Sequence, residues 1–260
     1  MADKTDSPIA PSDLPEVVKK IRARTPARLL AGRAGAAYRT GTQLKLREDH
    51  AAARDAVRAE LDLNEAFGAA FVGQWKLFEA STKAAGKDEY LVRPDLGRAF
   101  SAASREEIRK RCPRGGDLQI VIGDGLSVTA VAAQVPPLLP LLCEGAAARG
   151  WTVGQTVVIR HCRVGVLNEI GELLDPKVAV LLIGERPGLA TAESLSAYMA
   201  FRPRASHTDA DRNLVSNIHA RGLSAPAATE RILNLAARMR EQGASGCGLR
   251  EDSARDKLGP

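Results

Sequence analysis

The sequence predicts an α/β fold, with a helical N-terminal region followed by a domain built on a mostly parallel β-sheet. Two observations predict it. After residue 115, short apolar runs bounded by Gly and Pro alternate with helical stretches, a pattern typical of βαβ units whose strands are buried on both faces. Before residue 115, the apolar residues recur with helical spacing. The composition of 45% hydrophobic and 26% charged residues over 260 positions allows a sizeable core.

The first predicted unit, residues 1–48, contains a short amphipathic helix and a basic arm. Leu14, Val17, Val18 and Ile21 fall at positions i, i+3, i+4 and i+7, which indicates one apolar helix face. So short a helix needs a surface to lie against. That surface belongs either to the same chain or to a different protein, and the sequence leaves both readings open. We expect residues 25–47, rich in Gly, Ala and Arg, to be extended.

The second predicted unit, residues 49–114, is helical. We expect one helix over 50–61 and another over 65–80, in which four aromatic residues (Phe67, Phe71, Trp75 and Phe78) form a stripe that packs into the core. Ser104 and Glu107 have the spacing of a capping box and predict a further short helix that ends before Pro113.

The third predicted unit, residues 115–260, is the α/β domain. Its pattern predicts strands over 118–122, 156–164 and 178–183, and helices over 126–150, 168–174, 192–201 and 227–240. The last helix has Gly243 as its stop signal.

The formal net charge of +6 comes from one stretch of the chain. The segment from Lys19 to Arg47 has nine basic residues and no acidic one, and the remainder of the chain has 28 basic residues against 31 acidic ones. A nucleic-acid arm usually interleaves aromatic residues that stack on bases, but Tyr38 is the only aromatic residue in this segment. We therefore expect no nucleic-acid partner. A non-catalytic binding or assembly module that uses this basic arm is the alternative function.

The four cysteines, Cys112, Cys143, Cys162 and Cys247, show no CxxC pair and favour a reduced, cytoplasmic environment. His161 and Cys162 are adjacent on a predicted strand and would point to opposite faces, so we expect no metal site there. The longest aliphatic run, residues 178–183, is too short for a membrane span, and the N-terminus does not have the pattern of a secretory signal.

Chemistry is expected where the predicted strands end, because ligands of open parallel sheets bind outside the carboxyl ends of the strands. The first strand leads into Gly123-Asp124-Gly125 and the third into Gly184-Glu185, so the Asp124 and Glu185 carboxylates are candidate acceptors for hydroxyl or amide groups of a ligand. Turn formation alone also explains such residues. The glycine pattern is not the full GxGxxG, because residue 128 is Val, so a nucleotide-dependent oxidoreductase is disfavoured.

A polar cluster of Arg212, Asn213, Ser216 and Asn217 precedes the last helix and predicts either turns or ligand contacts. None of the four histidines lies in a pattern with a Ser or Cys nucleophile, so classical nucleophilic catalysis has no support.

Eight strings in order along the chain resemble the small (light) subunit of ethanolamine ammonia-lyase, and the resemblance runs from about residue 13 to residue 251. They are TPAR at 25–28, GRAG at 32–35, DHAAA at 49–53, YLVRPDLGR at 90–98, GDGLS at 123–127, IGE at 170–172, LIGERPGL at 182–189 and SNI at 216–218. RPDLGR and IGERPGL are the most specific of them.

The resemblance implies a Rossmann-like domain over 115–260 that contributes part of an adenosylcobalamin site. The family enzyme converts ethanolamine into acetaldehyde and ammonia by a radical mechanism, and its large subunit holds the substrate. The implied assembly is a hexamer of heterodimers, in which the small subunit is inactive alone. The N-terminal region is expected to direct the enzyme into a bacterial microcompartment, by contact with a shell protein.

Carried over residue by residue, the implied cobalamin contacts are Val164, Glu185 and Leu214. The family commonly has Cys at the position of Leu214, so this contact is preserved only if it is made by backbone or packing. The sequence also does not contain the Asp-x-His-x-x-Gly motif that supplies a histidine to cobalt in some cobalamin enzymes. This is consistent with a cofactor that keeps its own lower base.

Overall fold

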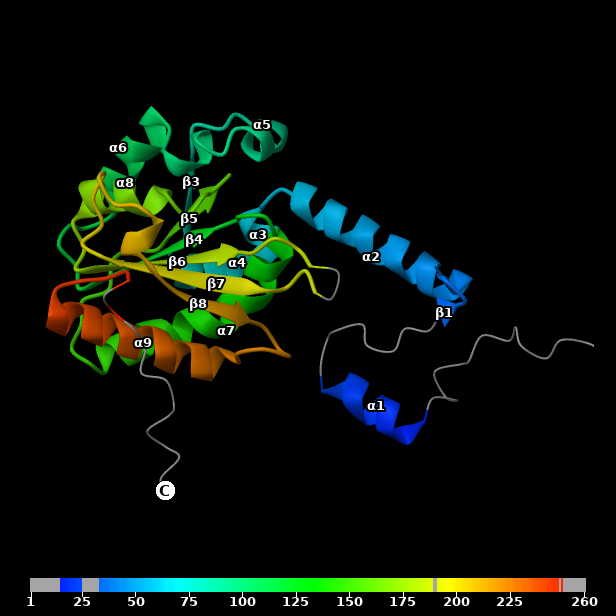
Figure 1. Ribbon diagram of the computed structural model, residues 1–260. Coiled ribbons are helices and arrows are strands. Elements are labelled where there is room, and N and C mark those ends of the chain that lie inside the picture. The colour runs from blue at the N-terminus through cyan, green and yellow to red at the C-terminus, as the bar shows by residue number, and fades with distance from the viewer. Residues whose placement is uncertain (1–14, 25–32, 189–190, 248, 250–260) are drawn as a thin grey trace, which may run out of the picture.

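The computed structural model describes residues 15–24, 33–188, 191–247 and 249. Its centre is a six-stranded sheet of order β3-β5-β4-β6-β7-β8, with helices on both faces (Figure 1). The strands are β3 Phe78–Ser81, β4 Leu118–Gly123, β5 Val157–Arg160, β6 Val178–Gly184, β7 Leu195–Phe201 and β8 Asn213–Ile218. The helices that cover the sheet are α3 Leu63–Phe67, α6 Ala102–Arg111, α7 Val128–Ala147, α8 Val166–Leu174 and α9 Ala225–Gln242.

The strand directions confirm the predicted α/β class with a mostly parallel sheet. β3, β5, β4 and β6 pair in parallel, β7 is antiparallel to β6, and β8 is antiparallel to β7. Five of the six strands therefore point the same way. The chain passes from β4 through α7 to β5, and then through α8 on the other face to β6. The strand order thus reverses between β4 and β6, and a ligand crevice is expected at their carboxyl ends.

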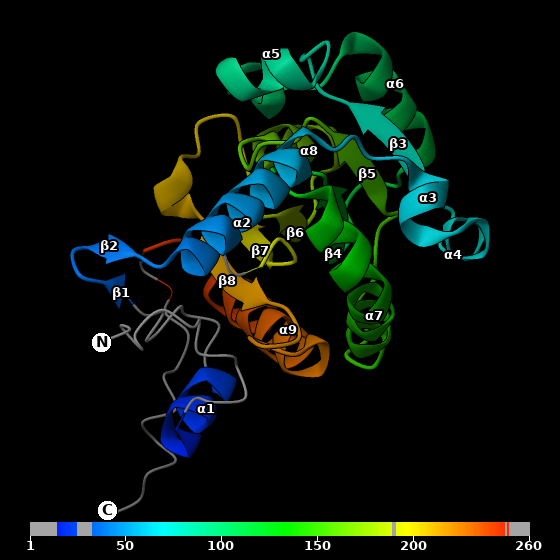
Figure 2. The same ribbon diagram turned by 90° about the vertical axis from the view of Figure 1, so that its right-hand side faces the viewer.

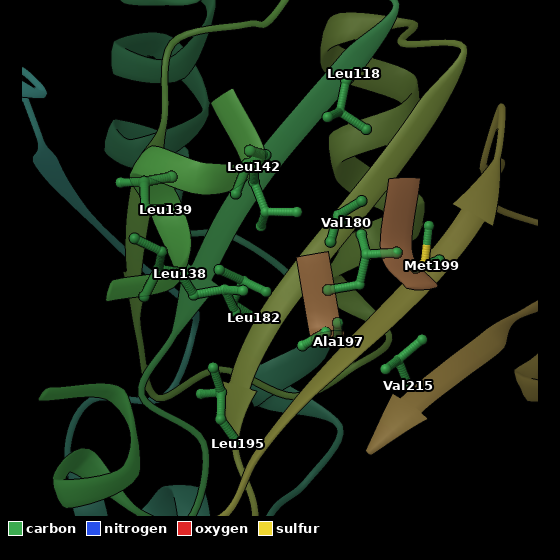
Figure 3. Packing of buried hydrophobic residues seen from close by; sticks show 14 of the residues in the cluster. Leu118, Leu138, Leu139, Leu142, Val180, Leu182, Leu195, Ala197, Met199 and Val215 are labelled. Atoms are coloured by element: carbon green, nitrogen blue, oxygen red, sulfur yellow. The ribbon is translucent and has the colours of Figure 1, made fainter. Parts of the chain in front are cut away.

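Two hydrophobic clusters lie on the two faces of the sheet. The first joins α7 and α9 to one face, and Figure 3 shows Leu138, Leu142, Val180 and Met199 of this cluster packed together. The second joins α6 and α8 to the other face. Fully burying a Leu or Val side chain contributes roughly 1.5–3 kcal/mol, so these two layers are the main source of stability.

The helix α7 is long and apolar enough to cross a membrane by length and composition. It is, however, a core helix of this fold, because Leu138, Leu139 and Leu142 are fully buried against the sheet and α9. Its hydrophobicity is explained by that packing.

Most elements of the α/β domain confirm the sequence prediction. The strands predicted over 118–122 and 178–183 are β4 and β6, and the helices predicted over 126–150, 168–174 and 227–240 are α7, α8 and α9. α9 ends at Gly243, which has the left-handed conformation expected of a C-cap (φ 65°). The strand predicted over 156–164 is shorter, because His161 has a positive φ of 56° and ends β5 at Arg160.

The helix predicted over 192–201 is wrong. Residues 195–201 form β7, which pairs with β6 along its whole length. Leu195, Ala197 and Met199 face the first cluster while Tyr198 packs against the second, which is the two-residue period of a strand. The polar segment before α9 is likewise a strand, β8, rather than a loop.

The single helix predicted over 65–80 is also wrong. Gly68 has a φ of 77° and separates α3 from α4 (Ala69–Gln74), and Lys76 has a φ of 49°. Phe67, Phe71 and Trp75 pack against the first cluster as expected, but Phe78 starts β3 and lies in the second cluster on the other side of the sheet.

The helix predicted from Ser104 begins three residues earlier. The N-cap of α6 is Ser101, whose hydroxyl accepts a hydrogen bond from the Ser104 N–H. The Glu107 carboxylate pairs with Arg111 instead of closing a capping box.

The N-terminal region contains α1 (Glu16–Ala23), a hairpin of β1 (Arg33–Ala34) and β2 (Ala37–Tyr38), and α2 (Thr40–Arg58). α1 confirms a short N-terminal helix, although Leu14 lies outside the described residues. The arm expected to be extended up to Arg47 is helical from Thr40, and α2 projects away from the sheet (Figures 1 and 2). Neither α1 nor α2 has a buried residue.

The unit boundaries at residues 48 and 115 stay predictions. The sheet does include β3, which comes from before residue 115 and pairs in parallel with β5. The described part of residues 49–114 therefore supplies the edge strand β3 of this sheet and two of the helices that cover it, α3 and α6.

Candidate functional site

The carboxyl ends of β4 and β6 are in direct contact, so the loops that follow them form one surface. The Leu126 N–H donates a hydrogen bond of 3.0 Å to the Gly184 carbonyl. A side chain at Gly184 would place its Cβ 2.0 Å from the Ser127 carbonyl oxygen, so only glycine fits there. The close approach predicted from Gly123-Asp124-Gly125 and Gly184 is thus present.

Asp124 is fully buried and serves the backbone of this chain, contrary to the expectation that its carboxylate contacts a ligand. It accepts hydrogen bonds from the N–H groups of His161 (2.9 Å) and Cys162 (2.8 Å). Lys87 Nζ lies 3.6 Å from its carboxylate. Burial raises the pKa of Asp124, whereas the Lys87 charge and the two N–H donors oppose that rise. Asp124 therefore fixes the β5 exit beside the β4 exit.

A segment that sequence reasoning missed covers the β5 exit. It comprises α5 (Lys87–Val92) and the 3₁₀ turn η2 (Leu96–Arg98). Figure 2 shows α5 on the side of the sheet where β3 and β5 lie. The Tyr90 hydroxyl donates a hydrogen bond of 2.9 Å to the Cys162 carbonyl, and the Arg163 guanidinium lies 4.2 Å from the centroid of the Tyr90 ring. Burial raises the pKa of Tyr90, so this hydroxyl stays a donor. The segment includes the RPDLGR string, whose function the spacing alone did not indicate.

A second contact to the β5 exit comes from the residues that follow α2. The Glu60 carboxylate pairs with Arg160 at 3.0 Å and lies 3.2 Å from His161 Nε2. Burial raises the pKa of Glu60, but the hydrogen bond from Arg160 and the neighbouring His161 outweigh it and leave that pKa lowered. The end of α2 is thereby attached next to the candidate crevice.

Val164 and Glu185 lie at this edge of the sheet. Val164 is half-buried against the second cluster, in the loop between β5 and α8. Glu185 directly follows β6, and its N–H donates a hydrogen bond of 3.0 Å to the Ser194 carbonyl. Its carboxylate is half-exposed and close enough to the Tyr198 hydroxyl to raise the pKa of that group, together with burial, which is the larger cause.

Leu214 lies farther along the sheet, on β8. It is paired with Tyr198 of β7, so its side chain is on the same face as the Tyr198 ring that approaches Glu185. It is 46% exposed, which is unusual for a large apolar side chain in a strand. It also lines a surface cavity of about 460 Å³ with Arg212, Asn213 and Cys247. Tyr198, which the sequence prediction did not single out, thus connects Glu185 with Leu214.

The polar cluster at 212–217 is mostly used within the fold. The Asn213 amide donates to the carbonyls of Gly246 and Leu249. Asn217 has a positive φ of 62°, and its Oδ1 lies 2.8 Å from His219 Nε2. Ser216 is exposed, and Arg212 bonds to Asn168 of α8.

Across the described residues, no three His, Cys, Asp or Glu side chains come together in a group able to hold a metal ion. Cys112 and Cys162 are buried, and burial raises the pKa of each thiol.

Comparison with known proteins points to one family. The family model of the ethanolamine ammonia-lyase light chain (EutC) matches residues 15–250. An ethanolamine ammonia-lyase small subunit from Clostridium perfringens is 42% identical over 235 residues, which cover 90% of this chain and 78% of that protein. The small subunits from Clostridioides difficile (40% identical, 90% and 78% covered) and Clostridium acetobutylicum (39% identical, 90% and 95% covered) match similarly. The chain therefore belongs to the family of ethanolamine ammonia-lyase small subunits.

Proposed function

We propose that this chain forms part of an adenosylcobalamin site, at its interface with the large catalytic subunit of ethanolamine ammonia-lyase. The observation that carries the proposal is the position of Val164 and Glu185 at the glycine-bordered edge where the strand order reverses. Leu214 lies on the same face of the sheet as its strand partner Tyr198, whose hydroxyl is close to Glu185. Ligands of open α/β sheets bind at such a place.

The residues present fit a cofactor of this size and chemistry. The corrin ring is broad and rimmed with amides, so it needs a surface where backbone approaches closely and where polar groups are available. The close backbone approach is supplied by the glycine contact between the β4 and β6 exits. The polar group is the half-exposed Glu185 carboxylate, which can accept hydrogen bonds from amide N–H groups. The exposed Leu214 side chain supports a contact made by packing, for which the thiol common in the family is not needed.

The role of this chain in the reaction is to bind and orient. When bound, adenosylcobalamin supplies the radical that starts the deamination of ethanolamine to acetaldehyde and ammonia. In the proposed complex, Val164, Glu185 and Leu214 hold the cofactor against the large subunit, where the substrate reacts. This chain alone is then inactive as a lyase.

The proposed assembly is a hexamer of heterodimers in the cytoplasm, inside a bacterial microcompartment. The name of the relatives, small subunit, supports a larger partner chain. α1 has its apolar Val17 and Ile21 62% and 40% exposed, which supports docking of this helix on a shell protein. Deleting residues 1–23 should abolish co-localisation with that protein, and unchanged co-localisation and solubility would contradict the docking.

The experiment that tests the function is co-expression with a candidate large subunit, followed by an ammonia or acetaldehyde assay with ethanolamine and adenosylcobalamin. The purified pair should be active and each chain alone inactive. Activity of this chain alone, or an inactive pair in which circular dichroism shows both chains folded, would contradict the proposal.

A substitution at Glu185 tests the placement of the site. Glu185→Ala should weaken adenosylcobalamin binding to the two-subunit complex by about 1.5–3 kcal/mol, the usual contribution of a hydrogen bond to a charged group, while the melting temperature changes little. Glu79→Ala is the matched control, because Glu79 is an exposed glutamate on the edge strand β3, which β5 and β4 separate from β6. Equal affinities of the two variants would show that Glu185 is not a contact.

A further inference from the structure

An arginine whose guanidinium makes no hydrogen bond among the described residues lies beside Val164. Arg98, at the end of η2, covers Gly165 with the aliphatic part of its side chain, because a Cβ on Gly165 would lie 2.9 Å from Arg98 Cγ. Arg98 is exposed, and no hydrogen bond or ion pair of its guanidinium is found among the described residues. Unpaired guanidinium groups are strong donors to oxyanions.

A second arginine is buried close by. The Arg212 side chain is only 4% exposed; its Nη2 donates a hydrogen bond of 2.8 Å to Asn168 in the first turn of α8, and its Nη1 pairs with Asp209. Its buried Nε has no hydrogen-bond partner in the described part of the chain. Both arginines lie at the N-terminal end of α8, Arg98 over Gly165 and Arg212 on Asn168. Burial lowers the pKa of Arg212.

The nearby acids are each bonded to another group. The pKa of Asp95 is lowered first by its hydrogen bonds from Arg93 and also by the nearby charge of Arg98, but Arg98 makes none of those hydrogen bonds. Asp211 accepts hydrogen bonds from Thr208. Glu169, also in the first turn of α8, is paired with Arg105 at 3.1 Å and accepts the Phe100 N–H at 2.7 Å. Asp209 is paired with Arg212. The first-turn N–H groups of α8 donate to the loop carbonyls before it, so α8 adds only the partial positive charge of its N-terminus. The Arg98 guanidinium, next to Val164, therefore has no hydrogen bond or ion pair of its own among the described residues.

We propose that Arg98, with Arg212 behind it, is the subsite for the phosphate group of the cobalamin nucleotide loop. The inference rests on the proposed function and assigns residues beyond Val164, Glu185 and Leu214. The periphery of the corrin carries neutral amides, so the phosphate is the anionic group of the cofactor. A guanidinium can also donate to the amide carbonyls of the corrin, but its charge-assisted, bidentate contact with a phosphate is the stronger one.

The test compares two corrins that differ only in the phosphate, cobinamide phosphate and cobinamide. Their binding to the purified two-subunit complex is measured by equilibrium dialysis and corrin absorbance, with no turnover. The wild-type complex should bind cobinamide phosphate about tenfold or more tightly than cobinamide, as expected of a charge-assisted contact. Arg98→Met keeps the stem over Gly165 and removes the charge, so this preference should disappear. Arg98→Lys should retain part of it.

Arg93→Ala is the matched control, because Arg93 belongs to the same RPDLGR segment but its guanidinium is bonded to Asp95. It should leave the preference for phosphate unchanged. An unchanged preference in Arg98→Met, an equal loss of affinity for both corrins, no preference in the wild type, or a loss of subunit assembly in Arg98→Met would each overturn the subsite. A wild-type complex that binds neither corrin nor adenosylcobalamin would instead refute the proposed function.

Discussion

At the scale of single residues, one carboxylate joins four parts of the sheet domain at the end opposite the crevice. Asp117, just before β4, accepts hydrogen bonds from the Thr152 N–H (2.9 Å), Lys177 Nζ (2.9 Å) and Arg240 Nη2 (2.9 Å). Thr152 follows α7, Lys177 precedes β6 and Arg240 is in α9. The hydrogen bond from Thr152, followed by that from Lys177, holds the pKa of Asp117 well below its usual range.

Asp117→Asn should lower the free energy of unfolding by about 1–3 kcal/mol at pH 7, because the donors on Thr152, Lys177 and Arg240 would then face a neutral amide in place of a carboxylate. A lowered pKa in the folded state means that this stabilisation is complete above the pKa of the unfolded chain, about 3.9, and is lost as the pH falls toward the folded value. Urea unfolding measured between pH 7 and pH 3 should therefore show an acid-induced loss that is smaller in the variant. Asp88→Asn is the control, since Asp88 is 84% exposed and pairs with an exposed Arg58. Identical losses in both variants would contradict the role of Asp117.

The site residues differ in how far the sequence could predict them. Glu185 was found because a glycine-flanked carboxylate directly follows an apolar strand, which is a local signal. Lys87, Tyr90 and Arg98 have no such signal, because they act only after their segment has folded over the ends of strands that are 20 or more positions away in the sequence. Asp124 carried the same local signal as Glu185, yet its carboxylate is turned inward to the backbone of β5.

At the scale of elements, the buried parallel strands were predictable, whereas the antiparallel strand β7 and the two edge strands β3 and β8 were not. β4 and β6 are buried at every position and read as continuous apolar runs. β7 and β8 are antiparallel, and β8 is half exposed, so their residues mix apolar and polar types in a way that also suits a helix or a loop. β3 has only four residues. The conformation of β3, β7 and β8 depends on the strands that they pair with, and the local sequence pattern does not show those partners.

The contact between the β4 and β6 exits can be tested with a single methyl group. Gly184→Ala would place a Cβ 2.0 Å from the Ser127 carbonyl oxygen and 2.8 Å from that of Asp124, both backbone atoms that cannot move independently. We expect a loss of about 1–3 kcal/mol in the free energy of unfolding, with weaker cobalamin binding, because Glu185 is the next residue.

Gly73→Ala is the control for this substitution. Gly73 lies within α4 and has no atom within 4 Å of an added Cβ, so alanine there should be neutral or stabilise by about 0.5–1 kcal/mol. Thermal or urea unfolding of the two variants measures the difference. A Gly184→Ala protein as stable as the Gly73→Ala protein would show that the exits are not tightly packed.

At the scale of the whole molecule, positive charge and unburied surface coincide in the N-terminal region. The acid-free stretch from Lys19 to Arg47 runs from α1 to the middle of α2, and these two helices have no buried residue. α2 is attached beside the candidate crevice through Glu60. No residue of this 19-residue helix is fully buried, so much of its surface is available for another subunit. We propose that the basic stretch docks on an acidic surface of the large subunit.

Docking of that kind should depend on salt. Exposed charges are screened over about 10 Å at 0.1 M ionic strength and over about 3 Å at 1 M, so the complex with the large subunit should dissociate more readily as sodium chloride is raised over that range. Sedimentation velocity at several salt concentrations measures the effect. Lys20→Ala/Arg47→Ala, at two exposed positions of the stretch, should weaken assembly at low salt and reduce its salt dependence. Lys110→Ala, an exposed cation on α6, should change neither. An assembly indifferent to salt would show that the basic stretch does not hold the subunits together.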